Sequence, residues 1–221
     1  MITIIHPSRE RAEIAKKIYD EWLFNADKHF EYYLCIEPDQ EADYLKYFNK
    51  EDIFVSDSMT AIEAINNGAK HAYKKGFDLL VVISDDFHCR DKWDLLLERK
   101  VEGKKNFLLK TFDGMHDWLV TLPIMDKEYY ESFGYVYAPC YKHMFADTEL
   151  TTVAQYTDRL LFANELKFLH KQFKDDLYDR NNKTWADGER VYLERYKNNF
   201  GVKKIKEITD LSHKKWLKAR I

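Results

Sequence analysis

Two adjacent carboxylates, Asp85 and Asp86, follow the apolar run FDLLVVI at residues 77–83 after one serine, Ser84. Like charges at the end of a buried strand are costly unless a cation or hydrogen bonds offset them. Mg²⁺ or Mn²⁺ would do so, because both ions take oxygen ligands and are commonly shared between carboxylates and a substrate's phosphates. A structural interpretation is that both carboxylates cap a helix that begins near Arg90. The pair alone does not decide between these interpretations.

A second group of polar residues could bind a ligand, because each follows a short apolar run or lies on the helix after it. These residues are Pro7, Ser8, Arg9, Arg11, Glu37 and Asn67. Arg9 and Arg11 equally suit surface positions on a helix.

The elements that must position these residues alternate between strands and helices in the first half of the chain. Four apolar runs predict strands, at residues 1–6, 30–37, 53–55 and 77–83. Helices are predicted after the first run, through Ile14, Ile18 and Trp22, and after the third, where Thr60 and Glu63 suit a capping box. This alternation predicts a mostly parallel α/β sheet, in which ligands bind at the carboxyl ends of the strands.

The second half of the chain carries a different pattern. Strand-like segments occur at residues 106–111, 118–122 and 160–170, and a helix is expected from about Lys127 to Phe133. Near Arg90, the predicted helix turns Trp93, Leu95 and Leu96 inward. We expect residues 1–170 to form one α/β domain, and the charged residues 171–221 to form a helical extension packed on it. No repeat or low-complexity linker marks a boundary between them.

The order of the motifs resembles GT-A glycosyltransferases related to the large inverting family two, over roughly residues 1–170. The segments that carry the resemblance are HPSRER, SMTAIEAINNGAKHAYKKGFDLLVVISDDFHCRDKWD and FADTEL. In that family a P-T/S-x-x-R turn holds the nucleotide, an Asn-Gly helix precedes the central strand, a DxD-like motif ends the strand, and a Trp-Asp pair follows. The matching residues are Pro7, Ser8, Arg11, Asn67, Gly68, Asp85, Asp86, Trp93 and Asp94. The resemblance implies a GT-A, Rossmann-like fold and a nucleotide-diphosphate sugar as donor. Arg9 or Arg11 would then stabilise the charge of the leaving diphosphate, and Glu37 and Asn67 would contact the base or ribose.

The same resemblance implies roles for individual residues around the metal. Asp86 would bind Mn²⁺ or Mg²⁺, and Asp85 would contact the ribose or sugar of the donor. The third acidic position of the family is Ser84 here, which departs from a three-aspartate motif but agrees with two-aspartate members. A late histidine of the family, on the metal or the diphosphate, corresponds to His170, with His88 as a weaker match. A lone histidine can equally be a structural hydrogen-bonding group.

An inverting transfer also needs a general base that takes the proton from the acceptor hydroxyl. Asp147, in the segment FADTEL, matches the family's aspartate at the start of an acceptor-side helix, and Glu149 is the rival candidate. The structural alternative is that Asp147 is the N-cap of that helix. The segment DGMHDW at residues 113–118 suits an acceptor wall, or a turn between two strands with Trp118 buried.

Composition and charge narrow the class of protein. Of the 221 residues, 45% are hydrophobic and 33% charged, which favours a folded domain over long disorder. No apolar run approaches the roughly 20 residues of a membrane helix, so we expect a cytoplasmic protein without a transmembrane segment. Three cysteines without CxxC spacing, Cys35, Cys89 and Cys140, predict reduced thiols rather than disulfides or a zinc site.

The acceptor stays open between two kinds of molecule. A formal net charge of −3 gives no global attraction to nucleic acid. Residues 202–221 are rich in lysine, which predicts an amphipathic helix with a solvated basic face or, alternatively, a local binding patch. A surface glycan and, as in some bacteriophages, a hydroxymethylated pyrimidine in DNA are both compatible acceptors.

Two other functions fit parts of the pattern. A nucleotidyltransferase also binds a nucleotide and metal on an α/β sheet, but the segment HPSRER lacks the glycines and lysine of the usual phosphate loop. A non-enzymatic interaction module is possible if Asp85 and Asp86 only cap a helix and the basic end of the chain docks a partner. Metal-dependent binding of a nucleotide sugar would separate the transferase from this module.

Overall fold

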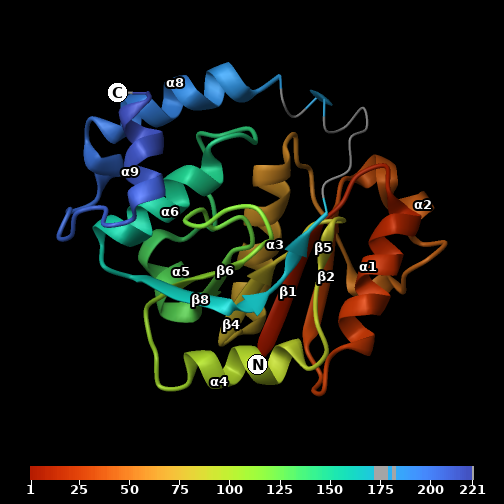
Figure 1. The fold of residues 1–221 in the computed structure, drawn as a ribbon. Helices are drawn as coiled ribbons and strands as arrows, with labels where there is room; N and C mark the ends of the chain where they lie inside the picture. Colours follow the sequence, from red (N-terminus) through yellow and green to blue (C-terminus); the bar gives the residue numbers. More distant parts are fainter. Residues whose placement is uncertain (172–178, 181–182, 221) are drawn as a thin grey trace.

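The computed structural model describes residues 1–171, 179–180 and 183–220. Seven strands form a central sheet: β1 (Ile2–Pro7), β2 (Glu31–Ile36), β3 (Ile53–Val55), β4 (Leu79–Val82), β6 (Leu108–Phe112), β7 (Ile124–Asp126) and β8 (Leu160–Lys167). Their order across the sheet is β3-β2-β1-β4-β7-β6-β8 (Figure 1). β7 runs antiparallel to both of its neighbours, and all the other pairs are parallel. The predicted mostly parallel sheet with β4 near its centre is confirmed.

Helices cover both faces of this sheet. The helices on one face are α1 (Ala12–Phe24), α2 (Glu41–Tyr44) and α4 (Trp93–Val101), and those on the other are α3 (Ala61–Lys75), α5 (Lys127–Phe133) and α6 (Ala146–Tyr156). Because successive strand residues point to opposite faces, Ile4 packs in the core with α1 and Ile5 in the core with α3. The result is a three-layer α/β fold.

The helix α3 shows how local sequence fixes one of these elements. The Thr60 hydroxyl accepts a hydrogen bond from the Glu63 N–H at 3.2 Å, so Thr60 is the N-cap. The Glu63 carboxylate accepts from the Met59 N–H rather than from that of Thr60, so the expected capping box is only half formed. Gly68 allows α3 to approach the sheet, because a Cβ there would lie 2.3 Å from Cys35 Sγ.

A separate two-stranded sheet pairs β5 (Phe87–His88) with β9 (Leu169–His170) in antiparallel orientation. Residue 87 pairs with residue 170, and the rings of Phe87 and His170 stack with centroids 4.3 Å apart. The backbone N–H of Lys171 donates to the Asp86 carbonyl at 2.8 Å. This small sheet therefore brings β9, which follows β8 in the chain, back to the carboxyl end of β4.

Two local predictions were wrong. The helix expected from near Arg90 exists and buries Trp93 as expected, but it begins only at Trp93, because the chain turns through Lys92 in the left-handed region at φ 54°, and it buries Leu97 rather than Leu95. Residues 118–122 form no strand; this segment is a buried loop before β7. Its apolar residues meet helices instead of a sheet neighbour, and the Val120 N–H donates to Thr151 Oγ1 on α6 at 3.0 Å.

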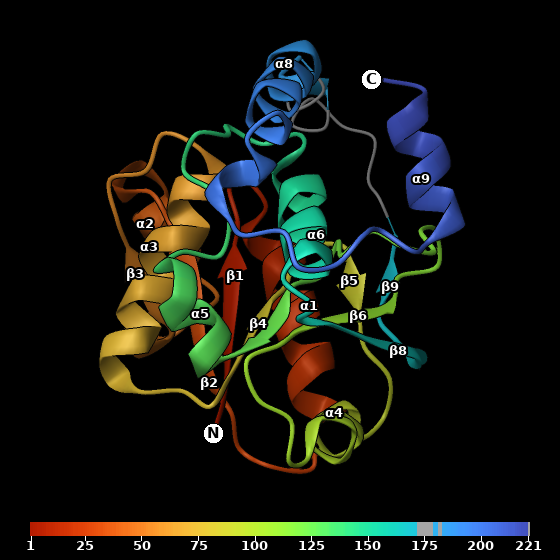
Figure 2. The same cartoon turned by 90° about the vertical axis from the view of Figure 1, so that its left-hand side faces the viewer.

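The C-terminal part packs on the α6 side of the molecule (Figure 2). It contains α8 (Trp185–Tyr196), a 3-10 turn at Asn199–Gly201 and α9 (Leu211–Lys218). α9 turns His213 and Leu217 inward and its lysines outward, as expected for a packed amphipathic helix. The predicted charged segment 171–201 lies partly outside the described residues, at 172–178 and 181–182. No helix in the described part of the chain is long and apolar enough to span a membrane.

Candidate active site

Asp85 is the centre of a buried hydrogen-bond network at the carboxyl end of β4. Its side chain is 4% exposed. Oδ1 accepts a hydrogen bond from Ser8 Oγ at 2.8 Å and lies 3.0 Å from His6 Nε2, while Oδ2 lies 3.7 Å from the Arg11 guanidinium. A buried carboxylate needs such partners to offset its lost hydration. The network therefore fixes Asp85 in one orientation.

Two tyrosines complete this network from neighbouring elements. The Tyr32 hydroxyl, on β2, lies 2.7 Å from His6 Nδ1. The Tyr44 hydroxyl, at the end of α2, lies 2.7 Å from Ser8 Oγ and accepts from the Arg11 N–H at 3.3 Å. Burial raises the pKa of Tyr44 to about 12, so it stays a neutral hydroxyl. The sequence interpretation missed His6, Tyr32 and Tyr44. His6 was detectable, because it is a histidine inside an otherwise apolar strand.

Asp86 lies beside Asp85 but faces different partners. Ser84 Oγ donates to Asp86 Oδ1, and His170 Nε2 lies 3.1 Å from Asp86 Oδ2. Burial raises the pKa of Asp86, but the hydrogen bonds and positive charge of its neighbours, His170 first, outweigh burial and leave that pKa below its usual value. The structure thus brings together the two residues predicted to bind a metal, from segments 84 residues apart.

The other nucleotide candidates lie around the same end of the sheet. Pro7 is the last residue of β1. Arg9 bridges Glu37 and Asp39, with nitrogen–oxygen distances of 3.1 and 2.9 Å. Asn67, on α3, donates to Ser58 Oγ at 3.2 Å in the segment that follows β3. Arg9 and Glu37 are therefore brought together, whereas Asn67 is engaged with its own neighbouring loop.

The helix-cap interpretation of the paired carboxylates is wrong. The N-cap of α4 is Lys92. The carboxylate near the start of α4 that accepts backbone hydrogen bonds is Asp94, from the N–H groups of Asp27 and Lys28. The two-residue strand β5 and a turn separate Asp85 and Asp86 from this helix. The pair therefore lies at the end of β4 and does not cap α4.

Asp147 is the second residue of α6. The N-cap of α6 is Phe145, with φ 72°, so the N-cap alternative for Asp147 is wrong. Asp147 is half-buried and accepts a hydrogen bond from the Thr148 N–H at 2.7 Å. Burial raises the pKa of Asp147, against the effect of the Thr148 hydrogen bonds and the nearby His116. A carboxylate with a raised pKa is a better proton acceptor.

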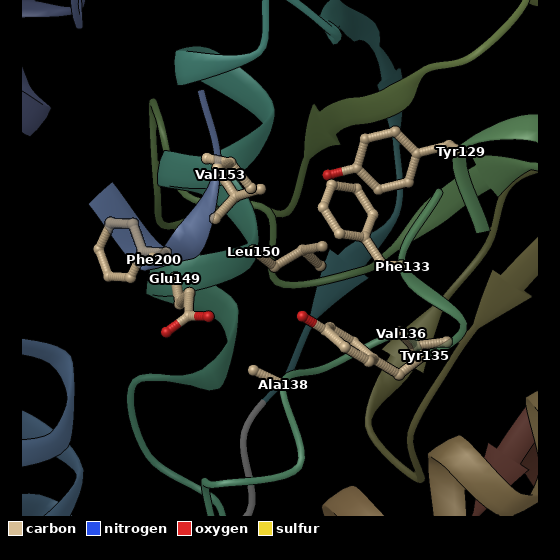
Figure 3. A pocket seen from close by; sticks show the side chains of 10 residues that line it. Tyr129, Phe133, Tyr135, Val136, Ala138, Glu149, Leu150, Val153 and Phe200 are labelled. Atoms are coloured by element: carbon tan, nitrogen blue, oxygen red, sulfur yellow. The ribbon is translucent and has the colours of Figure 1, made fainter. Parts of the chain in front are cut away.

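Glu149, the rival base, is already engaged. Its carboxylate accepts two hydrogen bonds from Arg195 and one from the Tyr141 hydroxyl, each at 2.7 Å. It borders a cavity of about 20 Å³, the space of about one water molecule. Figure 3 shows that the other walls of this cavity are mostly apolar. Glu149 therefore ties α8 to α6 and is occupied by structural partners.

The segment 113–118 contacts His170 at one end and the C-terminal helix α9 at the other. The Asp113 carbonyl accepts from the His170 N–H at 2.9 Å, beside the residue that contacts Asp86. Trp118 stacks on His213 of α9, with ring centroids 3.9 Å apart, and is buried. The indole is therefore not available to stack on a sugar, and the exposed residues of this segment are Gly114, Met115 and Asp117.

His143 is a further residue that the sequence interpretation did not select. It precedes α6 and is half-buried. Burial lowers the pKa of His143, and the negative charge of Asp86 acts in the opposite direction. Asp86 therefore acts electrostatically on His143, although the two residues are 57 positions apart in the chain.

The residues at the end of β4 fit a divalent cation that takes part of its shell from a ligand. Within residues 1–171, 179–180 and 183–220, no three His, Cys, Asp or Glu side chains are grouped to hold a metal by themselves. Asp86 supplies oxygen, and His170 Nδ1 is buried without a hydrogen-bond partner among the described residues. Mg²⁺ and Mn²⁺ sites of this kind usually complete their shell with phosphate oxygens and water.

Comparison with solved structures identifies the fold. A mannosyltransferase from Pyrobaculum calidifontis, in complex with GDP-Man and Mn²⁺, matches with a TM-score of 0.61 and 11% identity, over 87% of this chain and 64% of that one. Glucosyl-3-phosphoglycerate synthase from Mycobacterium tuberculosis, with Mn²⁺, UDP and phosphoglyceric acid, matches with a TM-score of 0.61 and 10% identity, over 87% and 78%. The chain has a GT-A fold.

The S. aureus protein TarS extends this comparison to the whole chain. Its residues 1–349 in complex with UDP-GlcNAc match with a TM-score of 0.56 and 13% identity, over 99% of this chain and 79% of that one. A longer TarS structure is covered to 47% of its length. No protein-family model and no curated protein matches the sequence significantly. The similarity therefore lies in the fold, and activity must be argued from the site.

Proposed function

We propose that this protein is a metal-dependent glycosyltransferase that moves a sugar from a nucleotide-diphosphate donor to an acceptor hydroxyl. The observation that carries the proposal is the carboxylate pair at the end of β4. Asp85 is immobilised by His6, Ser8 and Arg11, while Asp86 is held beside His170. This division gives one carboxylate for the donor and one for a metal, on a fold whose solved examples include one with GDP-Man and Mn²⁺ and one with UDP and Mn²⁺.

The donor-side residues have distinct tasks in this proposal. Asp86 and His170 would hold Mn²⁺ or Mg²⁺, and the ion would stabilise the charge of the leaving diphosphate. Asp85 accepts hydrogen bonds from the ribose or sugar, and the guanidinium groups of Arg9 and Arg11 face the diphosphate.

The base or ribose is read by Glu37 and Asn67 in this proposal, and Pro7 and Ser8 shape the turn beneath the nucleotide. Ser8 is buried and already joined to Asp85, so a donor that contacts Asp85 also senses the turn at the end of β1. The position of Glu37 beside Arg9 agrees with a polar pocket at the end of β2.

Asp147 acts as the general base. It takes the proton of the acceptor hydroxyl, whose oxygen attacks the anomeric carbon from the face opposite the diphosphate. The bond between that carbon and the diphosphate oxygen breaks, and its electron pair leaves with the nucleoside diphosphate. Because one displacement occurs at the anomeric carbon, the product has inverted configuration.

The acceptor hydroxyl belongs to a surface glycan in our preferred proposal, because a net charge of −3 gives no general attraction to DNA. The alternative, a hydroxymethylated pyrimidine in DNA, is favoured by the outward lysines of α9, at positions 214, 215 and 218. Salt distinguishes the two, since binding to DNA weakens steeply as salt is added. Transfer to a neutral glycan should change little between about 50 and 200 mM salt.

A thermal-shift experiment tests the proposed function. UDP-, GDP- and other nucleotide sugars are screened with and without Mn²⁺, on the wild type, on Asp86→Ala and on the control Asp91→Ala. Asp91 is exposed and lies in the same loop. We expect one donor to raise the melting temperature only with Mn²⁺, in the wild type and the control but not in Asp86→Ala. No stabilisation by any donor would contradict the proposed function.

A further inference from the structure

Two buried hydrogen-bond chains end on the same oxygen of Asp85. One runs from the Tyr32 hydroxyl through the ring of His6 to Oδ1, over distances of 2.7 and 3.0 Å. The other runs from the Tyr44 hydroxyl through Ser8 Oγ to Oδ1, over distances of 2.7 and 2.8 Å. All five residues are buried. Each chain therefore connects a tyrosine to the proposed donor-binding carboxylate through one intermediate residue.

The number of available hydrogens fixes the direction of the chain through Ser8. A carboxylate only accepts hydrogen bonds, so the Ser8 hydroxyl donates its single hydrogen to Asp85 Oδ1. Ser8 Oγ then accepts from the Tyr44 hydroxyl, whose oxygen accepts from the Arg11 N–H at 3.3 Å. Burial raises the pKa of Tyr44 to about 12, so this hydroxyl keeps its hydrogen at neutral pH. Every donor in the chain therefore points toward Asp85.

The same reasoning places the hydrogen on the ring of His6. Nε2 faces Asp85 Oδ1, so Nε2 carries a hydrogen and donates it. In the neutral ring Nδ1 is then an acceptor, and the Tyr32 hydroxyl donates to it. Burial raises the pKa of Tyr32 well above its ordinary value, and the negative charge of Asp85 adds to this effect, so Tyr32 keeps its hydrogen. Tyr32 thus favours the tautomer of His6 that donates to Asp85.

The two oxygens of Asp85 are unequal as a result. Oδ1 accepts hydrogen bonds from both His6 and Ser8. Oδ2 lies 3.7 Å from the Arg11 guanidinium, and no hydrogen bond from the described part of the chain reaches it. A hydroxyl of a ribose or sugar is a donor that Oδ2 can accept. The position of Oδ2 depends on both chains, because together they fix the other oxygen of the same carboxylate.

We propose that Tyr32 and Tyr44 are positioning residues for the donor. Through His6 and Ser8 their hydroxyls hold Oδ1 of Asp85, and this leaves Oδ2 to accept a hydrogen bond from a hydroxyl of the nucleotide sugar. The inference rests on the proposed function, in which Asp85 contacts the ribose or sugar. It goes further, because it names the oxygen that makes this contact and two buried tyrosines on which the contact depends.

An NMR experiment tests the chain through His6 without any donor. The ring nitrogen signals of His6, assigned by their loss in His6→Gln, are compared in the wild type, Tyr32→Phe and the control Tyr19→Phe. Tyr19 lies on α1 and packs against the ring of Tyr32, with centroids 4.6 Å apart, but belongs to neither chain. We expect the hydrogen on Nε2 in the wild type and the control, and a shifted Nδ1 signal in Tyr32→Phe. A hydrogen on Nδ1 in the wild type, or equal Nδ1 signals in all three proteins, would overturn the inference.

Donor binding and donor hydrolysis test the consequence for the site. Calorimetry measures the Kd of the stabilising nucleotide sugar with Mn²⁺, and hydrolysis at saturating donor, with water as acceptor, measures kcat. In Tyr32→Phe and in Tyr44→Phe the Kd should rise about fivefold, the change expected for one lost neutral hydrogen bond. The kcat should change little, because Asp85 contacts the donor both before and during the reaction. Tyr19→Phe should match the wild type in both measurements.

A double variant tests whether Tyr44 acts through Ser8. Ser8→Ala should raise the donor Kd at least as much as Tyr44→Phe does, because it removes the group that contacts Asp85. Once Ser8 Oγ is gone, the Tyr44 hydroxyl has no path to the carboxylate, so adding Tyr44→Phe to Ser8→Ala should leave the Kd unchanged. A Kd raised by the product of the two single effects would show that Tyr44 acts by general packing, against the inference.

The outcomes separate this inference from the proposed function. A wild-type Kd in both Tyr32→Phe and Tyr44→Phe would overturn the inference while leaving the transferase intact. Absence of Mn²⁺-dependent donor binding in the wild type would overturn the proposed function, and the nitrogen signals of His6 would still decide how the chain to Asp85 is built. The melting temperature of each variant confirms that it is folded.

Discussion

The proposed donor side and the proposed acceptor side of this site are built in different ways. On the donor side, Ser8 directly follows β1 and Asp85 lies three residues after β4, and further members of their network come from the neighbouring elements β2 and α2. On the acceptor side, Asp147 lies on a helix whose position depends on later parts of the chain. Glu149 of that helix pairs with Arg195 on α8, and Thr152 lies 3.3 Å from His213 of α9.

This difference suggests how the two sides can change independently. The hydrogen bonds around Asp85 join residues of the first 86 positions, so their geometry follows largely from the parallel sheet, whereas Asp86 takes its partner His170 from β9. The acceptor side is held by the C-terminal helices, which pack into the core on the α6 face. A change in that C-terminal part should therefore alter the acceptor site and leave the donor site intact.

Replacing the proposed base gives the largest expected effect and tests whether the two sides separate. Asp147→Asn should reduce donor hydrolysis and transfer by about 10²–10⁴-fold, the range for loss of a general base. Donor binding should be unchanged, because the donor network contains no residue of α6. Initial rates and Mn²⁺-dependent thermal shifts measure the two effects.

Asp187→Asn on α8 is the control for that variant, since Asp187 pairs with Arg190 of its own helix at 2.7 Å. It should behave as the wild type in both assays. If Asp147→Asn lost donor binding as well, the two sides would not be separable, and if it kept full activity, another group would be the base.

The same contrast explains what the sequence could predict. The strands β1 to β4 and the residues after them follow from short-range patterns, because apolar runs, caps and turns lie within a few residues of the groups they position. Asp85 and Asp86 were placed correctly at the end of a central strand for this reason. The role of Tyr44 was not readable, because it depends on where α2 packs against β1.

The acceptor side was less predictable, because its contacts join distant segments. Trp118 looked like part of a strand or an acceptor wall, but it stacks on His213, nearly a hundred residues later. Glu149 looked like a rival base until Arg195 was placed against it. Asn66 was overlooked beside Asn67, yet its side chain binds the backbone of residues 136 and 137. Local patterns carry no information about such pairs.

Breaking the contact between α6 and α8 should give the next largest effect. Glu149→Ala removes the partner of Arg195 and of the buried Tyr141 hydroxyl, and should lower the free energy of unfolding by about 3 kcal/mol. Urea denaturation measures this change. Lys206→Met, which removes the exposed pair with Asp158, is the control and should cost at most about 0.5 kcal/mol. Equal effects of the two variants would contradict a structural role for Glu149.

The donor side offers a matched test of packing. Gly68→Ala should lower the free energy of unfolding by about 1–2 kcal/mol, because the new Cβ would lie 2.3 Å from Cys35 Sγ and 3.2 Å from Ile5 Cγ2. The double variant Gly68→Ala, Cys35→Ala should recover part of that loss, since the sulfur is removed. Additive effects in urea denaturation would show that α3 does not approach the sheet this closely.

The docking of α9 predicts a smaller, pH-dependent effect. His213 is fully buried, and burial lowers its pKa to about 4, below the value near 6.5 of an unfolded chain. Between these values the unfolded chain binds more protons, so stability is present above about pH 6.5 and is lost as the pH falls. At pH 6 the loss should be about 1 kcal/mol relative to neutral pH. The difference in unfolding free energy between wild type and His213→Gln should therefore shrink from pH 7.5 to pH 6, and a difference independent of pH would show that His213 is not held neutral against Trp118.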